Sequence, residues 1–319
     1  MQIYASGNKY ILFLEITQFC FETNNRKMNG NMLRWVLFIT LSFIWGSSFI
    51  LMKLGMGHLN AFQVASVRIV ASGIVLLPLA VKSFKKIPAG KMWIVFFSGS
   101  LGSLLPAYLF CFAEQGIDSS LAGTLNSLTP IFVIITGAIF FQSKTSLQKT
   151  MGVLVAFSGS MMLFFTQPDA VISGNLHYVL LVMLATLFYG FNVNLVQRYL
   201  KDIPSLQIVS VALCLNAIPA LIALYFFGYF SLDLMSKGVL ISTGFSILLG
   251  ALGTSIANIL FYILIKNSGV VFAAMVTYGI PFVAILWGIV YHENIGRMQI
   301  LSLCVILLGV YLANKRPSI

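Results

Sequence analysis

Ten apolar stretches, each about 20 residues long, follow one another from Leu33 to Ala313 with short polar breaks between them. A bilayer core about 30 Å thick requires about 20 apolar residues per helix, and each helix must satisfy its own backbone amides there. The pattern predicts an all-α membrane protein with ten transmembrane helices. The expected spans are 33–54, 61–81, 91–113, 119–141, 147–165, 175–197, 204–228, 238–265, 268–290 and 297–313.

Composition excludes a soluble domain. The chain is 59% hydrophobic and 8% charged, whereas soluble domains carry about 25% charged residues. A chain of 319 residues also lacks the volume to hide ten apolar helices from water.

The net charge of +11 indicates orientation rather than nucleic-acid binding. Most lysines and arginines fall in one alternate set of loops and in the terminal segments. By the positive-inside rule these segments are cytoplasmic, which predicts a multi-pass plasma (inner) membrane protein with both termini in the cytoplasm. Residues 1–32 are expected to be a cytoplasmic tail, with Met28 or Met32 as alternative starts to Met1.

The chain also repeats itself. At a displacement of 151 residues, Gly102 falls on Gly253 and Pro130 falls on Pro281; nearer the start, at a displacement of 144, Gly46 falls on Gly190. The interpretation is two five-helix repeats, 33–165 and 174–313. Because five is odd, the second repeat is inverted, an architecture in which secondary transporters bind substrate at the repeat interface.

These features resemble the EamA family of the drug/metabolite transporter superfamily. The resemblance rests on the ten spans in two halves, the motif 45–49 (WGSSF), Arg68, the paired prolines and Glu293. It implies a plasma-membrane transporter, often an exporter of amino acids or other small metabolites. Gln142 and Ala212 stand where a second copy of Glu293 and of Arg68 would lie.

Several polar and aromatic residues within the spans are candidates for a substrate cavity between the halves. Arg68 is the sharpest, because its planar fork suits a carboxylate or phosphate; snorkelling is its alternative role. Interhelical packing is the alternative for most of the others. The expected cavity residues are Trp45, Ser47, Ser48, Arg68, Tyr108, Asn126, Tyr189, Asn192, Asn258, Tyr262 and Tyr278.

Glycines and prolines at matching positions are candidates for hinges or close packing. Proline removes a backbone donor inside a helix, and glycine allows helices to approach closely. The residues in this class are Gly46, Gly190, Pro130 and Pro281.

Glu114 and Glu293, near helix ends, are candidate proton or gating sites. No carboxylate lies in the middle of a predicted helix, so the sequence leaves open whether transport is coupled to protons, driven by exchange with a counter-substrate, or uncoupled.

An enzyme is the rival class, but the chain has no H-E-x-x-H, G-x-S-x-G or Walker motif. No metal or cofactor is expected, because the four cysteines are scattered and form no CxxC pair. The expected partners are a small-molecule substrate and the lipid bilayer, with protons or a counter-substrate in addition. A channel, a translocator of lipids or hydrophobic compounds, and a structural membrane protein remain alternatives.

Overall fold

Within the described residues, nine helices are long and apolar enough to cross a membrane, and a tenth apolar helix, Val270–Val283, is shorter. The structure is a computed structural model that describes residues 30–117, 119–166, 176–290 and 296–315. The predicted all-α membrane fold is confirmed. Of the expected tail, only residues 30–32 are described, and they begin the first helix.

The first five crossings are formed by α2, α3, a composite third helix, a broken fourth helix and α8. Their bounds are α2 (Gly30–Gly55), α3 (Ala61–Phe84), η1 (Ala89–Lys91), α4 (Met92–Gly99), η2 (Ser100–Leu104), α5 (Leu105–Ala113), α6 (Ser119–Asn126), α7 (Thr129–Phe141) and α8 (Leu147–Phe165).

The last five crossings repeat this order. Their bounds are α9 (Leu176–Tyr199), α10 (Ser205–Phe226), η3 (Tyr229–Ser231), α11 (Lys237–Leu248), η4 (Leu249–Ile256), α12 (Ala257–Ser268), α13 (Val270–Ala274), η5 (Met275–Gly279), α14 (Ile280–Val290) and α15 (Arg297–Asn314). The ninth crossing, expected over 268–290, is divided into α13, η5 and α14.

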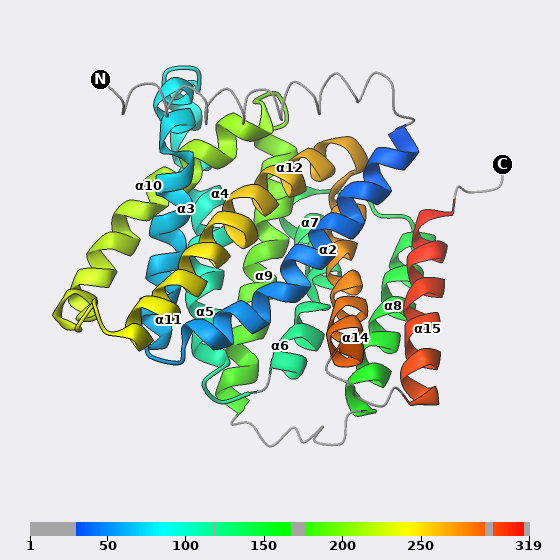
Figure 1. The fold of residues 1–319 in the computed structure, drawn as a ribbon. Coiled ribbons are helices and arrows are strands. Elements are labelled where there is room, and N and C mark those ends of the chain that lie inside the picture. Colours follow the sequence, from blue (N-terminus) through cyan, green and yellow to red (C-terminus); the bar gives the residue numbers. More distant parts are fainter. Residues whose placement is uncertain (1–29, 118, 167–175, 291–295, 316–319) are drawn as a thin grey trace.

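Equivalent helices of the two repeats pack against each other. The second and seventh crossings, α3 and α10, form the most extensive helix pair, followed by the fifth and tenth, α8 and α15. Figure 1 shows these pairs at opposite edges of the bundle, with α9 between them. The start of α2 and the end of α15 lie at the same end of the bundle (Figure 1), as an even number of crossings requires.

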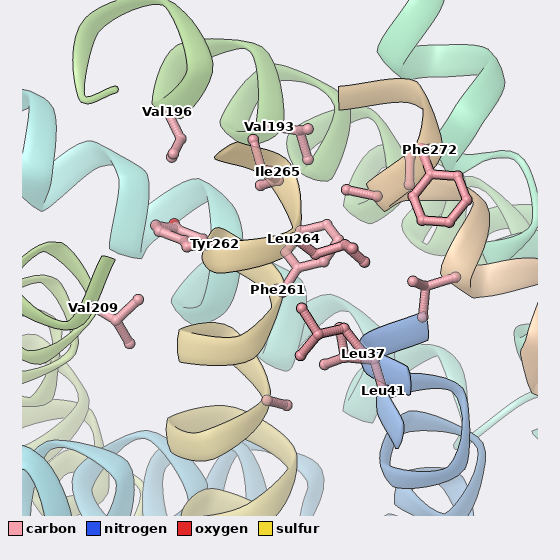
Figure 2. Close-up of a cluster of buried hydrophobic side chains, with 14 of the residues drawn as sticks. Leu37, Leu41, Val193, Val196, Val209, Phe261, Tyr262, Leu264, Ile265 and Phe272 are labelled. Carbon is pink, nitrogen blue, oxygen red and sulfur yellow. The ribbon is translucent and has the colours of Figure 1, made fainter. Parts of the chain in front are cut away.

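Near the start of α2, apolar side chains pack together at one end of the bundle. We call this cluster the apolar seal and define it as Leu37, Leu41, Leu264, Ile265 and Phe272. Each of its members is buried. Figure 2 shows side chains from α12 lying between α2 and α9. Side chains packed this closely leave little room for water between them.

Candidate functional site

A cavity lies between the two repeats, beyond the apolar seal along α2. The space between atoms there amounts to about 800 Å³, a figure that includes space open to solvent. The lining comes from both repeats: Trp45, Ser48, Phe49, Met52, Arg68, Gly102, Ser103, Phe110, Asn126, Thr129, Tyr189, Asn192, Gly253, Asn258, Phe261, Ala274 and Thr277. Arg68 is the only charged residue among them.

The structure brings seven of the predicted cavity residues into this lining. They are Trp45, Ser48, Arg68, Asn126, Tyr189, Asn192 and Asn258. They come from the first, second, fourth, sixth and eighth crossings. Side chains that are distant in sequence therefore converge on one space. Their contact with a substrate remains a prediction.

Three predicted tyrosines are absent from this lining, and the hydroxyl of each has a protein partner. The Tyr108 hydroxyl lies 2.7 Å from that of Ser66. The Tyr278 hydroxyl donates to the Val153 carbonyl at 2.8 Å, and its contact with a substrate stays a prediction. Tyr262 donates to Asn192 Oδ1 at 3.1 Å and supports a lining residue from behind.

Ser47 is also absent from the cavity lining, whereas its neighbour Ser48 is part of it. Successive residues on a helix point in directions about 100° apart, so adjacent serines cannot share one face. The buried Ser48 hydroxyl donates to the Ile44 carbonyl at 2.8 Å.

Two aromatic pairs face the cavity from equivalent positions of the repeats. Trp45 contacts Phe261 with ring centroids 5.0 Å apart, and Tyr189 contacts Phe110 with centroids 6.1 Å apart. Position 45 corresponds to 189, and 110 corresponds to 261, by the two sequence displacements. The repeat is therefore preserved in side-chain contacts as well as in helix order.

Two π-helical segments, η2 and η4, also occupy equivalent positions. A π turn widens the helix and shifts its carbonyls away from the regular pattern, and such segments are frequent at functional sites. The Gly253 carbonyl in η4 accepts a hydrogen bond from Trp45 Nε1 at 3.1 Å. Thr254 Oγ1 accepts one from Arg68 Nε at 2.7 Å. The η4 segment thus orients both side chains.

The paired prolines mark where the fourth and ninth crossings break. Pro130 begins α7 after the turn that ends α6, and Pro281 lies at the start of α14 after the 3₁₀ segment η5. Asn126 and Thr277, which correspond by the displacement of 151, line the cavity at these two breaks. The breaks place polar groups at mid-membrane; hinge motion remains a prediction.

Gly46 and Gly190 lie at close helix contacts. A Cβ added at Gly46 would lie 2.7 Å from the Val283 Cβ, and one added at Gly190 would lie 2.9 Å from the Phe132 carbonyl carbon. The partners, like the glycines, correspond between the repeats. Small residues therefore allow α2 to approach α14, and α9 to approach α7.

Sequence reasoning missed the apolar part of the lining, which includes Phe49, Met52, Phe110 and Phe261. Single apolar residues in apolar helices carry no directional signal. The displacement of 151 that aligns Phe110 with Phe261 was the one available indication.

Of the two candidate gating carboxylates, Glu293 lies outside the described residues. Glu114 follows α5 directly as its C-terminal cap. Within the described part of the chain, no group of three His, Cys, Asp or Glu residues could hold a metal ion.

Comparison with known proteins agrees with this architecture. The family model described as "EamA-like transporter family" matches residues 33–165 and 176–315. The chain belongs to the EamA-like transporter family. It is therefore a multi-pass membrane transporter, as predicted from the resemblance.

Individual EamA relatives are similar along most of their length. An uncharacterized transporter of Archaeoglobus fulgidus is 26% identical over 287 residues, covering 89% of this chain and 100% of the relative. The uncharacterized inner membrane transporter YedA of Escherichia coli is 24% identical over 291 residues, covering 88% and 92%. A solved crystal structure shares the fold, with a TM-score of 0.68 and 15% identity over 88% of this chain and 95% of the other.

Proposed function

We propose that this EamA protein is a carrier that moves small organic solutes across the plasma membrane by alternating access, with the solute held in the central cavity. The observation that carries the proposal is the cavity lining, which both repeats supply from equivalent positions around one arginine. Inverted repeats that rock about a shared midplane site are the structural basis of alternating access. We further propose cytoplasmic termini and export as the main direction, both from the sequence pattern and the family resemblance.

The charge of the cavity favours an anionic group on the solute. The Nε of Arg68 is bonded to Thr254, and within the described residues its terminal nitrogens have no hydrogen-bond partner. Arginine binds carboxylates through two parallel hydrogen bonds. No carboxylate belongs to the lining that the described residues form, so the guanidinium charge is available to a ligand.

Several hydrogen-bond acceptors around the cavity are occupied by the protein itself. Asn192 Oδ1 accepts from Tyr262, the Thr254 carbonyl accepts from Asn258, and the Gly253 carbonyl accepts from Trp45. A buried ammonium group requires charged or multiple acceptors. The cavity therefore suits a carboxylate without an adjacent ammonium better than a zwitterionic amino acid.

The remaining wall is apolar and aromatic. Trp45, Phe49, Phe110, Tyr189 and Phe261 surround the polar groups. Ligand sites of this kind bury an apolar body and fix its orientation through a few polar contacts. We therefore propose as substrates small organic carboxylates with an apolar or aromatic body.

The test is counterflow in proteoliposomes with three compounds that share a ring but differ in charge: 3-phenylpropionate, phenylalanine and 2-phenylethylamine. We expect saturable, trans-stimulated uptake, fastest for the carboxylate and slowest for the amine. Arg68→Gln should abolish the preference for the carboxylate. The matched control is Arg198→Gln, because Arg198 is exposed at the end of α9 and lies outside the lining.

Two results would contradict this proposal. Flux that does not saturate and carries current would indicate a channel. Equal uptake of all three compounds by folded wild type and by Arg68→Gln would show that the arginine does not select the solute.

A further inference from the structure

Among the described residues, the carboxyl group of Glu114 is enclosed without a hydrogen-bond partner. Both side-chain oxygens are buried, and neither makes a hydrogen bond to another described residue. The Ser119 hydroxyl is near enough to lower the pKa of this carboxyl, but it does not reach hydrogen-bond geometry with either oxygen. An ionised carboxylate in such a place loses its hydration without compensation.

The surrounding charges reduce this cost only in part. Lys53 at the end of α2 and Arg68 on α3 act on Glu114 electrostatically, and neither forms an ion pair with it among the described residues. Burial outweighs their attraction and raises the pKa of Glu114 to about 8.

The other titratable groups nearby come from α5 and α9. Cys111 lies one turn before Glu114 on α5 and interacts with it electrostatically. At the start of α9, His177 stacks against Tyr178 with ring centroids 4.1 Å apart, and Tyr178 packs on Gly116. Asp118 lies outside the described residues.

The inverted repeat identifies the residue of the second half that corresponds to Glu114. By the displacement of 151, Glu114 corresponds to Ile265, a fully buried member of the apolar seal (Figure 2). The register is reliable here, because α6 begins at Ser119 and α13 begins at the corresponding Val270. Glu114 thus occupies, at the opposite end of the bundle, the place that an isoleucine takes in the seal.

The other positions of the seal have apolar counterparts at that end. Leu37, Leu41, Leu264 and Phe272 correspond to Leu181, Ala185, Ala113 and Leu121. A neutral carboxylic acid can be buried among such side chains, whereas a carboxylate disfavours their closure.

We propose that Glu114 is a proton-binding gate residue, which holds a proton while its end of the transporter is closed and releases it to solvent when that end opens. The inference rests on the alternating access proposed above. It makes the proton a ligand of the closed state, so that closure at this end is coupled to proton uptake.

The first test measures closure without any solute. Spin labels at Leu54→Cys and Leu176→Cys report the separation of α2 and α9 at the Glu114 end; both positions are exposed. With reactive native cysteines replaced, we expect a short distance at pH 6 and a growing long-distance population through pH 8 to 9. Glu114→Gln should keep the short distance at every pH, and Glu114→Asp should retain the pH response.

The matched control is Asp202→Asn, which removes an exposed carboxyl in the loop between α9 and α10 and should leave the response unchanged. A wild-type distance independent of pH would overturn the proposal, as would an identical pH response in wild type and Glu114→Gln.

A transport measurement separates this inference from the proposed function. If 3-phenylpropionate exchanges, its rate should vary with pH in wild type and be nearly constant between pH 6 and 9 in Glu114→Gln. Exchange with the same pH profile in both proteins would overturn the gate alone. Absence of exchange, together with a pH-dependent distance that Glu114→Gln abolishes, would contradict the proposed solute and support the gate.

Discussion

The contact between α8 and α15 provides a direct test of how closely the transporter's helices must approach. A Cβ added at Gly159 would lie 2.7 Å from the backbone nitrogen of Ile306 and 3.0 Å from the Ser302 carbonyl oxygen. Ordinary contacts begin at 3.4 Å, so Gly159→Ala requires the helices to separate by about 0.7 Å against fixed backbone atoms. Such overpacking costs about 1–3 kcal/mol.

The matched control is Gly244→Ala in α11, where an added Cβ would meet no atom within 4 Å. Both variants gain the same helix propensity, about 1 kcal/mol, so this gain cancels in the comparison. We expect Gly159→Ala to be less stable than Gly244→Ala by about 1–3 kcal/mol, measured by SDS-induced unfolding in mixed micelles and followed by circular dichroism. Equal stability of the two variants would refute the reasoning that backbone contact fixes this helix pair.

Three further substitutions test individual side chains. Tyr278→Phe removes the hydrogen bond to Val153 and should reduce stability by about 1 kcal/mol without changing the KM for exchange; a changed KM would place Tyr278 at the substrate. Asn216→Leu removes the amide that donates to the Phe96 carbonyl at 3.0 Å and should cost about 1–3 kcal/mol in the same unfolding assay; unchanged stability would show that this bond contributes little. The stability that Glu114 contributes should be complete below its ordinary pKa of 4.5 and be lost as pH rises towards about 8, because the folded state retains a proton that the unfolded state releases. Glu114→Gln should flatten the dependence of the unfolding free energy on pH when unfolding is followed from pH 5 to 8. The same slope in both proteins would contradict the burial of the Glu114 carboxyl.

The crossings were predictable because hydropathy and length alone define them. The division of the ninth crossing was not, since Pro281 is compatible both with a kinked continuous helix and with a break. The structure resolves this choice in favour of a 3₁₀ segment, η5, before α14.

Side-chain direction was harder to predict than helix position. In a helix that is apolar all round, periodicity does not identify the face that turns inward, so Tyr278 and Trp45 looked equally suited to a cavity. Arg68 was identifiable because a charge at that depth requires water, protein or a counter-ion. Its partner Thr254 was not, because the pairing depends on the π-helical segment η4, which no local sequence rule predicts.

The two equivalent aromatic pairs at the cavity differ in geometry, and this difference can be used to follow conformational change. The two repeats place Trp45–Phe261 at 5.0 Å and 66°, and Phe110–Tyr189 at 6.1 Å and 25°. If alternation exchanges the conformations of the two halves, the opposite-facing state is already described by these values with their assignments swapped. The internal asymmetry of a single structure then serves as a coordinate for the transport cycle, and ring-specific spectroscopy at Trp45 could follow that coordinate in both directions.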